Sequence, residues 1–334
     1  MKDYFRAIPR TDVARPSGSM AIAGGWCWFS DVEHLRRGKP AEIVPISEVP
    51  KDVITKITAP RAAITGLGMS APRVMGILNV TPDSFSDGGR FVSPEIAMEH
   101  ATTMVREGAD ILDIGGESTR PGADFVPINE EITRTAPVIA ALREQMSVPI
   151  SIDTRKSAVA EAALEAGANL LNDVAAMTFD PDMAQVAAGA NAPMCLMHAQ
   201  GDPATMQANP SYDDVLLDVY DFLEERLASA CENGISPSSV ILDPGIGFGK
   251  TLEHNLALLR RISLFHSLGC PILLGASRKR FIGTISGAEA ADQRVSGSVA
   301  VGLGALAQGV QILRVHDIAQ TKQAISLFWR LLED

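Results

Sequence analysis

The chain alternates short apolar segments with helical segments about eight times, beginning near Arg73. Alanine-rich segments with apolar residues at i, i+3 and i+4 predict helices over residues 94–107, 130–145, 212–232 and 293–308. The apolar segments between the helical ones are typical of buried parallel strands and read VMGILNV, DILDIG, PISID, NLLN, MCLMH, VILD, PILLGA and VQILRV. A right-handed strand–helix crossover repeated so often favours a closed TIM (β/α)8 barrel over an open sheet.

Nearly every predicted strand ends in a polar side chain. In a barrel the carboxyl ends of all strands meet at one mouth, where the active sites of this architecture lie. Asp and Asn also cap helices, and Asp173 and Asp317 suit that role, but a buried strand has no structural reason to end in a carboxylate. We therefore expect the ring to form a site. Its members are Asn79, Asp113, Asp153, Asn172 with Asp173, His198, Asp243, Ser277 to Lys279, and Arg314 with His316.

Residues 1–70 do not follow the repeat and contain two of the three tryptophans. We interpret residues 1–70 as an N-terminal extension of unknown role, with the tryptophans as packing groups, and residues 71–334 as the barrel.

Charge and cysteine content limit the partners and the compartment. A net charge of −11 argues against broad binding to nucleic acid or an anionic membrane, although a local basic pocket could still bind a small phosphate ligand. The four cysteines form no CxxC pair, which favours reduced thiols in the cytoplasm. The apolar run Met20–Phe29 is too short to span a bilayer, so neither an export signal nor a membrane helix is predicted.

The stretch VILDPGIGFGKT, residues 240–251, resembles a phosphate-binding loop at first sight. A Walker A loop needs four residues between its first glycine and the Gly-Lys pair, whereas only three separate Gly245 from Gly249. Pro244, just before Gly245, has no N–H to donate. We reject the nucleotide-binding interpretation, and the stretch needs another explanation that includes Asp243.

Three further loops carry chemistry. NVTPDSFSDGGRF and GGESTRPGADFVP follow the first two strands and suggest a two-part cover, although a plain surface loop explains their composition equally well. After the seventh strand, Arg278, Lys279 and Arg280 form either a surface charge run or a phosphate site of the kind found near strands seven and eight of TIM barrels. With Arg314 and His316 nearby, acids and cations together predict a substrate that is part heterocycle and part phosphate.

The motifs NVTPDSFSDGG, GGESTRPGA, SIDT, LLNDV, LMHAQG, LDPGIGFGK, SRK and RVHD follow one another between Met75 and Ile325. In this order they resemble the dihydropteroate synthase family. The resemblance implies a TIM barrel and a transferase that joins 7,8-dihydropterin-6-ylmethyl diphosphate to p-aminobenzoate, giving 7,8-dihydropteroate and pyrophosphate in folate synthesis. It also implies a requirement for Mg²⁺ and a homodimer.

Carried over position by position, the resemblance assigns roles to individual residues. Asn79 would hold Mg²⁺ with Asp87, and Arg314 and His316 would bind the leaving diphosphate. Arg280 stands where many members have a serine that contributes to the p-aminobenzoate carboxylate site, so its charge or its backbone N–H would have to replace that contact. The pterin would be bound by Asp153, Asn172, Asp243 and Lys279. The p-aminobenzoate pocket would be shaped by Phe85, Thr119, Arg120, Pro121, Phe248 and Ser277.

Two alternatives remain open. A pterin-binding methyltransferase barrel shares the fold and a pterin-binding Asp and Asn, but it gives no use to the basic residues after the last two strands. A catalytically silent barrel kept as a scaffold would be free to lose Asn79, Arg120, Lys279 or His316, and all four are present.

Overall fold

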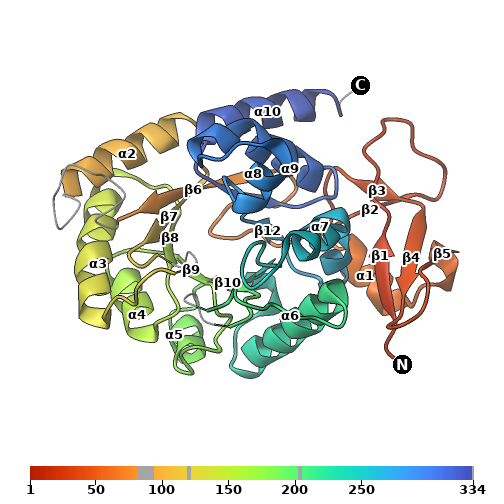
Figure 1. The fold of residues 1–334 in the computed structure, drawn as a ribbon, viewed down its shortest axis with the longest axis horizontal. Coiled ribbons are helices and arrows are strands. Elements are labelled where there is room, and N and C mark those ends of the chain that lie inside the picture. Colours follow the sequence, from red (N-terminus) through yellow and green to blue (C-terminus); the bar gives the residue numbers. More distant parts are fainter. Residues whose placement is uncertain (81–93, 119–121, 202–204, 333–334) are drawn as a thin grey trace.

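The structure of the protein is a computed structural model that describes residues 1–80, 94–118, 122–201 and 205–332. A parallel barrel surrounded by helices forms most of it, and the N-terminal region lies to one side (Figure 1). The barrel strands are β6 (Arg73–Asn79), β7 (Ile111–Gly115), β8 (Ile150–Asp153), β9 (Leu170–Asp173), β10 (Met194–Met197), β11 (Val240–Asp243), β12 (Leu273–Leu274) and β13 (Ile312–Val315).

The strands pair in parallel in the order β11-β10-β9-β8-β7-β6-β13-β12. The two ends of this sheet meet, because Leu242 of β11 forms a parallel bridge with Ile272 just before β12. The backbone N–H of Leu242 donates to the carbonyl of Pro271 over 2.9 Å. The predicted (β/α)8 barrel is therefore confirmed.

Helices follow the strands and cover the outside of the barrel (Figure 1). The predicted helices agree with the structure except at their ends; the 212–232 helix begins only at Val215. Asp214 fixes that start, because its side chain accepts from the backbone N–H groups of Leu216 and Leu217. The helices are α2 (Pro94–Arg106), α3 (Ile128–Gln145), α4 (Ser157–Glu165), α5 (Met183–Gly189), α6 (Val215–Glu232), α7 (Leu252–Arg260), α8 (Arg280–Ser286), α9 (Val295–Leu306) and α10 (Ile318–Arg330). Short 3-10 turns are η3 (Pro237–Ser239), η4 (Ile262–Leu268) and η5 (Asp292–Arg294).

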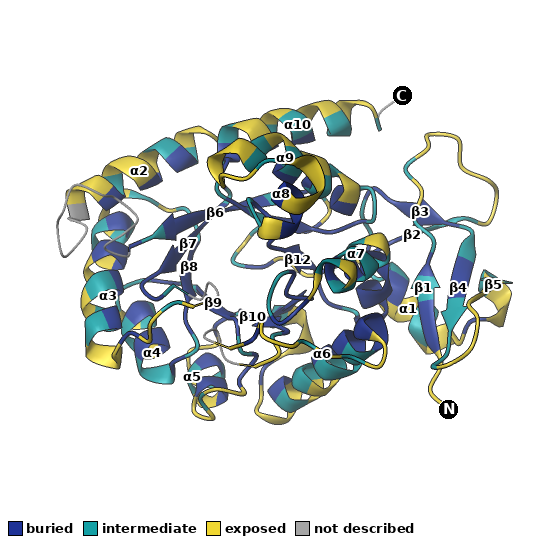
Figure 2. Ribbon diagram, viewed as in Figure 1, coloured by how far each residue is buried: buried dark blue, intermediate teal, exposed yellow. Residues whose placement is uncertain are grey.

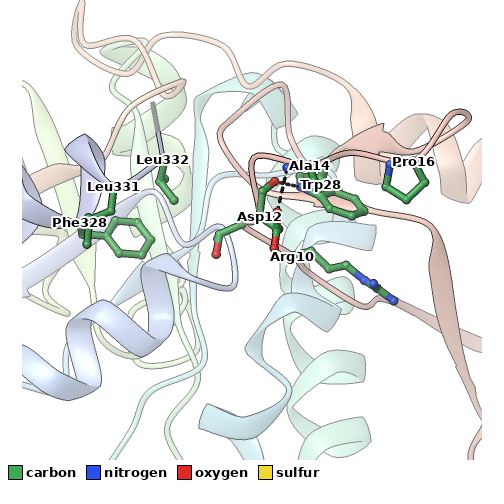
Figure 3. A pocket seen from close by; sticks show the side chains of 9 residues that line it. Arg10, Asp12, Ala14, Pro16, Trp28, Phe328, Leu331 and Leu332 are labelled. Carbon is green, nitrogen blue, oxygen red and sulfur yellow. Dashed lines mark hydrogen bonds between the residues drawn. The ribbon is translucent and has the colours of Figure 1, made fainter. Parts of the chain in front are cut away.

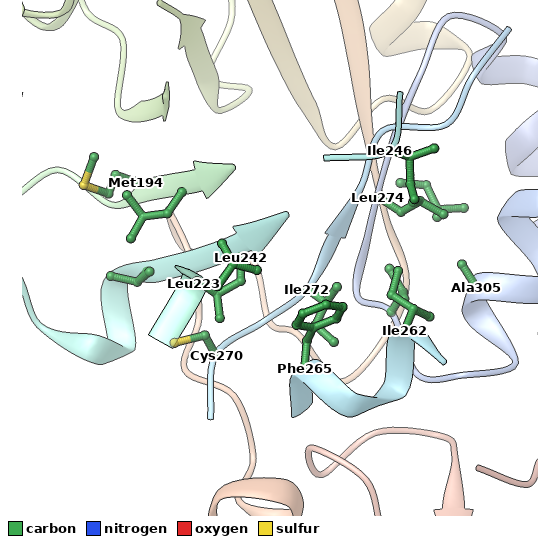
Figure 4. Close-up of a cluster of buried hydrophobic side chains, with 14 of the residues drawn as sticks. Met194, Leu223, Leu242, Ile246, Ile262, Phe265, Cys270, Ile272, Leu274 and Ala305 are labelled. Atoms are coloured by element: carbon green, nitrogen blue, oxygen red, sulfur yellow. The ribbon is translucent and has the colours of Figure 1, made fainter. Parts of the chain in front are cut away.

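Side chains alternate along each strand between the barrel interior and the surrounding helices. In β7, Leu112 and Ile114 belong to the outer apolar core, whereas Ile111 belongs to a separate inner cluster. Figure 4 shows the part of the outer core in which β10, β11 and β12 face α6 and η4. The inner cluster fills the amino-terminal end of the barrel and consists of Ile64, Met69, Met75, Ile111, Leu170, Cys195, Ile241, Leu273 and Ile312. Two residues further along β7, β9, β11 and β13, the inward positions are Asp113, Asn172, Asp243 and Arg314.

The N-terminal region forms its own small sheets beside η4 and α6 (Figure 1). Its strand β1 is largely buried, and β4 is buried in part (Figure 2). Trp26 binds the barrel directly: its indole N–H donates to the Leu306 carbonyl over 2.7 Å, and its ring lies 5.7 Å from that of Trp329. The elements are β1 (Tyr4–Ala7), β2 (Met20–Ala21), β3 (Trp28–Phe29), β4 (Asp31–Leu35), β5 (Glu42–Pro45), η1 (Ile46–Glu48) and α1 (Lys51–Thr58). The order in the larger antiparallel sheet is β1-β4-β5.

Among the described residues, no helix is long and apolar enough to cross a membrane.

Candidate active site

The carboxyl end of the barrel collects buried charges of both signs. The guanidinium of Arg314 donates from Nε to Oδ2 of Asp113 over 2.5 Å and from Nη2 to Oδ2 of Asp153 over 2.6 Å. Asn172 donates from its amide to the same oxygen of Asp113 over 3.2 Å. Four of the polar strand ends that the sequence singles out therefore lie in one hydrogen-bonded group.

This group is incompletely satisfied. Oδ1 of Asp113 and Oδ1 of Asp153 are both buried and have no hydrogen-bond partner. The Asp113 residue is fully buried and Asp153 is 7% exposed. A buried polar atom without a partner costs free energy, so two such oxygens in one place mark a site for a ligand that supplies N–H donors.

Burial also changes the protonation of the group. Burial raises the pKa of Asp153 to about 7, and the nearby Asp113 carboxylate also raises it. The Arg314 cation acts in the opposite direction. For Arg314, burial lowers the pKa, but the carboxylates of Asp113 and Asp153 outweigh burial and raise it overall. The site thus holds a permanent cation beside a carboxyl group able to exchange a proton near neutral pH.

Asp243 faces the same space from β11. A Cβ built on Gly275 would lie 3.7 Å from Oδ2 of Asp243 and 3.9 Å from Cδ of Arg314, so the two side chains flank this glycine. Oδ1 of Asp243 accepts from the backbone N–H of Gly245 over 2.7 Å. Burial raises the pKa of Asp243, while Lys279 acts in the opposite direction.

The stretch at residues 240–251, which does not match a phosphate-binding loop, contains a tight turn that begins at Asp243. Gly245 has φ +67°, and a Cβ there would lie 1.8 Å from the carbonyl oxygen of His198, so no other residue fits. Phe248, within this turn, stacks with the Lys279 ammonium, which lies 4.5 Å from the ring centroid. Lys279 also donates to the carbonyl of Ile246.

The basic run after β12 divides between two roles. Burial lowers the pKa of Lys279 to about 8, and the Asp243 carboxylate partly offsets this effect. Arg278, in contrast, forms a two-point ion pair with Asp317, and Arg280 is exposed. Only Lys279 of the three contacts the Asp243 turn.

His316 and Ser277 are neighbours at the ends of β13 and β12. Nδ1 of His316 lies 3.1 Å from the Ser277 hydroxyl, which also accepts from the backbone N–H of His316 over 3.2 Å. Asn79 lies beside the acid group: a Cβ on Gly115 would be 3.5 Å from its amide oxygen and 3.7 Å from Cβ of Asp153.

Other predicted site residues cannot be placed. Phe85 and Asp87 of the first loop, and Thr119, Arg120 and Pro121 of the second, lie outside the described residues. Within the described part of the chain, no group of three His, Cys, Asp or Glu side chains could hold a metal ion. The Asn79 oxygen nevertheless fits Mg²⁺, which binds oxygen ligands and often takes only one or two from the protein, with substrate phosphates completing its shell.

The two aspartates proposed as helix caps behave differently. Asp173 points away from the interior, and its oxygens accept from the backbone N–H groups of Ala175 and Met177, so it fixes a turn that precedes α5. Asp317 occupies the residue before α10, but its side chain makes no capping bond and pairs with Arg278.

Sequence reasoning missed two buried lysines. Nζ of Lys250 lies 2.8 Å from Nδ1 of His198, at the end of β10. Nζ of Lys156 donates to Glu117 over 3.0 Å and to Glu131 over 2.6 Å, at the base of the second loop. Their partners are distant in the sequence, so no local motif indicates them. The position of Lys250 in a glycine-rich segment is the one available signal for it, whereas Lys156 follows Arg155 in a polar segment and has no such signal.

The pocket drawn in Figure 3 lies elsewhere, between the N-terminal region and the end of α10, with a volume of about 620 Å³. Arg10 stacks on Trp28 at its edge, with 5.6 Å between the guanidinium carbon and the ring centroid. None of the residues predicted for the site lines it. Its lining consists of Arg10, Thr11, Asp12, Ala14, Pro16, Trp28, Phe328, Leu331 and Leu332.

Comparison with known proteins places this geometry in context. Residues 75–316 match the family model described as pterin binding enzyme. A dihydropteroate synthase from Synechocystis is 48% identical over 260 residues, which cover 77% of this chain and 90% of the relative. The structure of Xanthomonas albilineans dihydropteroate synthase with 4-aminobenzoic acid is 45% identical, covers 82% of this chain and 99% of its own, and superposes with a TM-score of 0.77. The same enzyme in complex with 7,8-dihydropteroate is 42% identical over 82% of this chain and all of its own, with a TM-score of 0.74.

Proposed function

The chain belongs to the dihydropteroate synthase family of pterin-binding enzymes, and from this premise we propose how its barrel mouth works. It is a transferase of folate biosynthesis that condenses 7,8-dihydropterin-6-ylmethyl diphosphate with p-aminobenzoate to give 7,8-dihydropteroate and pyrophosphate. The observation that carries the assignment of roles is the pair of buried, unpartnered carboxylate oxygens of Asp113 and Asp153 beside Asp243.

The acid group binds the pterin ring. A pterin has ring N–H and amino groups, which are donors for the free oxygens of Asp113 and Asp153 and for the carboxylate of Asp243. Asn172 adds an amide, and Lys279 supplies a cation on the other side of Asp243. Asp113 was predicted as a member of the ring of polar strand ends, but the family resemblance gave it no role; its contact with Arg314 supports a role in the pterin site.

The diphosphate lies toward β13. Two N–H groups of Arg314 are used by Asp113 and Asp153, and a guanidinium has five, so Arg314 has N–H groups left for phosphate oxygens. His316, next to Ser277, is half-buried at the same end of the barrel. Asn79 would hold Mg²⁺, with Asp87 as a second ligand, and the ion would supply charge stabilisation to the departing diphosphate.

The p-aminobenzoate subsite lies at the Asp243 turn. The Phe248 ring provides an aromatic wall, and the Lys279 ammonium over that ring is near enough to attract the carboxylate of the substrate. Ser277 is the neighbouring hydroxyl, while Phe85 and residues 119–121 would complete the pocket from the loops.

The reaction follows from the charges around the pterin. As the diphosphate departs, positive charge develops on the pterin, and the fixed carboxylates of Asp153 and Asp243 stabilise it. Arg314 and His316 stabilise the negative charge that develops on the leaving group. The arylamine then attacks the methylene carbon with its own lone pair as the C–O bond to the diphosphate breaks, and the new secondary amine loses its extra proton to water. Neither a protein nucleophile nor a strong base is required.

We also propose a domain arrangement, an oligomeric state and a location for the protein. Residues 1–70 are an extension packed on the catalytic barrel of residues 71–334. Leu327 and Leu331 are 64% and 79% exposed on and just after α10, which supports a homodimer through the outer helices. The four free cysteines support a cytoplasmic location.

The test is a product assay on the purified full-length protein. Pyrophosphate release is measured from dihydropterin diphosphate with and without p-aminobenzoate and with and without Mg²⁺. We expect Mg²⁺-dependent release with an equal amount of dihydropteroate. Pterin binding without release of pyrophosphate would contradict the proposal and favour a pterin-binding scaffold or a methyltransferase.

A further inference from the structure

Four successive carbonyl groups of the glycine-rich turn each accept a hydrogen bond from a different side chain. Backbone carbonyls in such a turn ordinarily face water or one another, so this arrangement fixes the path of the turn residue by residue. The donors come from the loop after β10, from the loop after β12 and from the end of the turn itself. The pairs are Ile246 with Lys279, Gly247 with Gln207, Phe248 with Lys250, and Gly249 with Tyr212.

Lys250 is the donor that lies inside the protein. It is 3% exposed, and its Nζ has three acceptors: Nδ1 of His198 at 2.8 Å, the Phe248 carbonyl at 3.0 Å and the His198 carbonyl at 3.3 Å. The protonated side chain has three N–H groups, which these three acceptors would satisfy; burial lowers the pKa of Lys250 well below its usual range, and the Asp243 carboxylate opposes this effect. The turn is thereby tied to the end of β10 through one side chain.

His198 is suited to accept a hydrogen bond from Lys250 rather than to act as a catalytic base. Burial and the neighbouring Lys250 hold the pKa of His198 well below its usual range, so its ring is neutral and one ring nitrogen carries a lone pair. Nδ1 is the nitrogen that faces Lys250, so the tautomer with the lone pair on Nδ1 accepts this bond. The backbone fits closely around this contact. A Cβ on Gly249 would lie 2.4 Å from the Gln200 carbonyl, just as one on Gly245 would collide with His198.

The turn positions two groups that the reaction needs. Phe248 lies between Gly247 and Gly249 and presents its ring to Lys279, whose ammonium binds the preceding carbonyl of Ile246. A Cβ on Gly247 would lie 3.2 Å from Cδ of Lys279, so a small displacement of the turn would move the lysine as well. The positions of Phe248 and Lys279 therefore depend on the hydrogen bonds that hold the turn in place.

We infer that Lys250 is a positioning residue for the second substrate: through the Phe248 carbonyl and His198 it holds the turn so that Phe248 and Lys279 form the p-aminobenzoate subsite. This inference rests on the proposed function. It assigns Lys250 no contact with substrate. Asp243 contacts the pterin from the start of the turn, where its own bond to Gly245 holds it, so pterin binding depends less on Lys250 than p-aminobenzoate binding does.

The test compares Lys250→Met with the wild-type protein. Methionine has a similar length and removes all three donors. Lys322→Met is the control for a lysine-to-methionine change, because Lys322 pairs with Asp110 at 2.7 Å at the opposite end of the barrel. Three quantities are measured for each protein: KM for p-aminobenzoate, kcat, and the Kd of a pterin by calorimetry, together with Tm.

We expect Lys250→Met to raise KM for p-aminobenzoate by roughly tenfold or more, with a smaller change in the Kd of the pterin, since displacements of about 1 Å at a site cost rates of this order. Tyr212→Phe, which removes only the outer donor to Gly249, should shift the same KM in the same direction by less. Lys322→Met should change Tm alone.

A Lys250→Met protein that loses Tm but keeps its KM for p-aminobenzoate would overturn the inference, as would equal losses for both substrates. If that variant does not fold, Lys250→Gln takes its place. It retains a donor for the Phe248 carbonyl and loses the bonds to His198, so the KM for p-aminobenzoate should rise by less than about tenfold but by more than the Kd of the pterin; an unchanged KM would overturn the inference. A wild-type protein that forms no dihydropteroate would refute the proposed function instead, so the two failures are distinguishable.

Discussion

Replacing Arg314 with methionine breaks two ion pairs at once, because the one guanidinium pairs with the buried carboxylates of both Asp113 and Asp153. Nε and Nη2 of Arg314 lie 2.5 and 2.6 Å from oxygens of Asp113 and Asp153, and both carboxylates already have a second oxygen without a partner. Methionine keeps the apolar stem of the arginine side chain and lacks its guanidinium group. The variant therefore removes the charge and both hydrogen bonds.

The expected cost is large. Breaking a buried ion pair by removing one partner lowers the free energy of unfolding by about 3–5 kcal/mol, because an uncompensated charge remains in the interior. The side chain of Arg314 is 19% exposed, and that exposure places the cost toward the lower end of this range, near about 3 kcal/mol.

The cost depends on pH, with a definite sign. Burial raises the pKa of Asp153 to about 7, so the folded state binds a proton more tightly than the unfolded state does. Such a group lowers the free energy of unfolding as the pH rises from about 4 through its folded pKa. Removing Arg314 takes away the cation that opposes this rise, so the pKa of Asp153 moves above about 7 and the loss of stability continues to higher pH.

Urea unfolding of both proteins, at about pH 5 and about pH 8, measures this effect. We expect the destabilisation by Arg314→Met to be clearly larger at the higher pH. Arg278→Met is a control, since Arg278 is 32% exposed and pairs with one carboxylate, Asp317. A destabilisation by Arg314→Met below about 1 kcal/mol, or one that is equal at both pH values, would refute the buried ion network as described.

Three further predictions concern the cation, the metal and the extension. Lys279 has a pKa lowered to about 8, so kcat/KM for p-aminobenzoate should fall as the pH rises through that value, and Lys279→Arg should move the fall to higher pH; an unmoved profile would exclude Lys279 as its source. Asn79→Ala should raise the Mg²⁺ concentration for half-maximal activity by roughly tenfold, and an unchanged Mg²⁺ titration would remove Asn79 from the metal site. Trp26→Ala removes a buried indole bonded to Leu306 and should cost about 3–5 kcal/mol in urea unfolding while kcat/KM stays constant; lost activity in the folded variant would give the extension a catalytic role.

The strand–helix repeat was sufficient to predict the barrel, because each strand is a short apolar run and each helix has its own periodicity. Alternation along a strand then determines which polar residue faces inward. Asn172 and Asp173 are adjacent in the sequence, yet only Asn172 contacts the acid group, while Asp173 fixes a turn outside it. Both residues belong to the predicted ring of polar strand ends, because the composition of a strand does not determine the residue at which it ends.

Contacts between distant residues account for what the sequence could not supply. Arg314 was expected at the diphosphate, but its ion pairs with Asp113 and Asp153 join residues that are 201 and 161 positions apart. Lys250 was considered only as part of a phosphate loop, because its partner His198 lies 52 residues away. Such pairs arise from closure of the barrel, which no local pattern encodes.

Calorimetric titration with a pterin that lacks the diphosphate tests the central claim most directly, that the acid group in the barrel mouth recognises the heterocycle. The wild-type protein is compared with Asp243→Asn, which keeps the shape of the side chain and removes its charge. We expect the wild type to bind and the variant to lose about 1.5–3 kcal/mol of binding free energy, which corresponds to roughly a tenfold to hundredfold weaker Kd. Equal affinity in two folded proteins would contradict the account and place the pterin elsewhere.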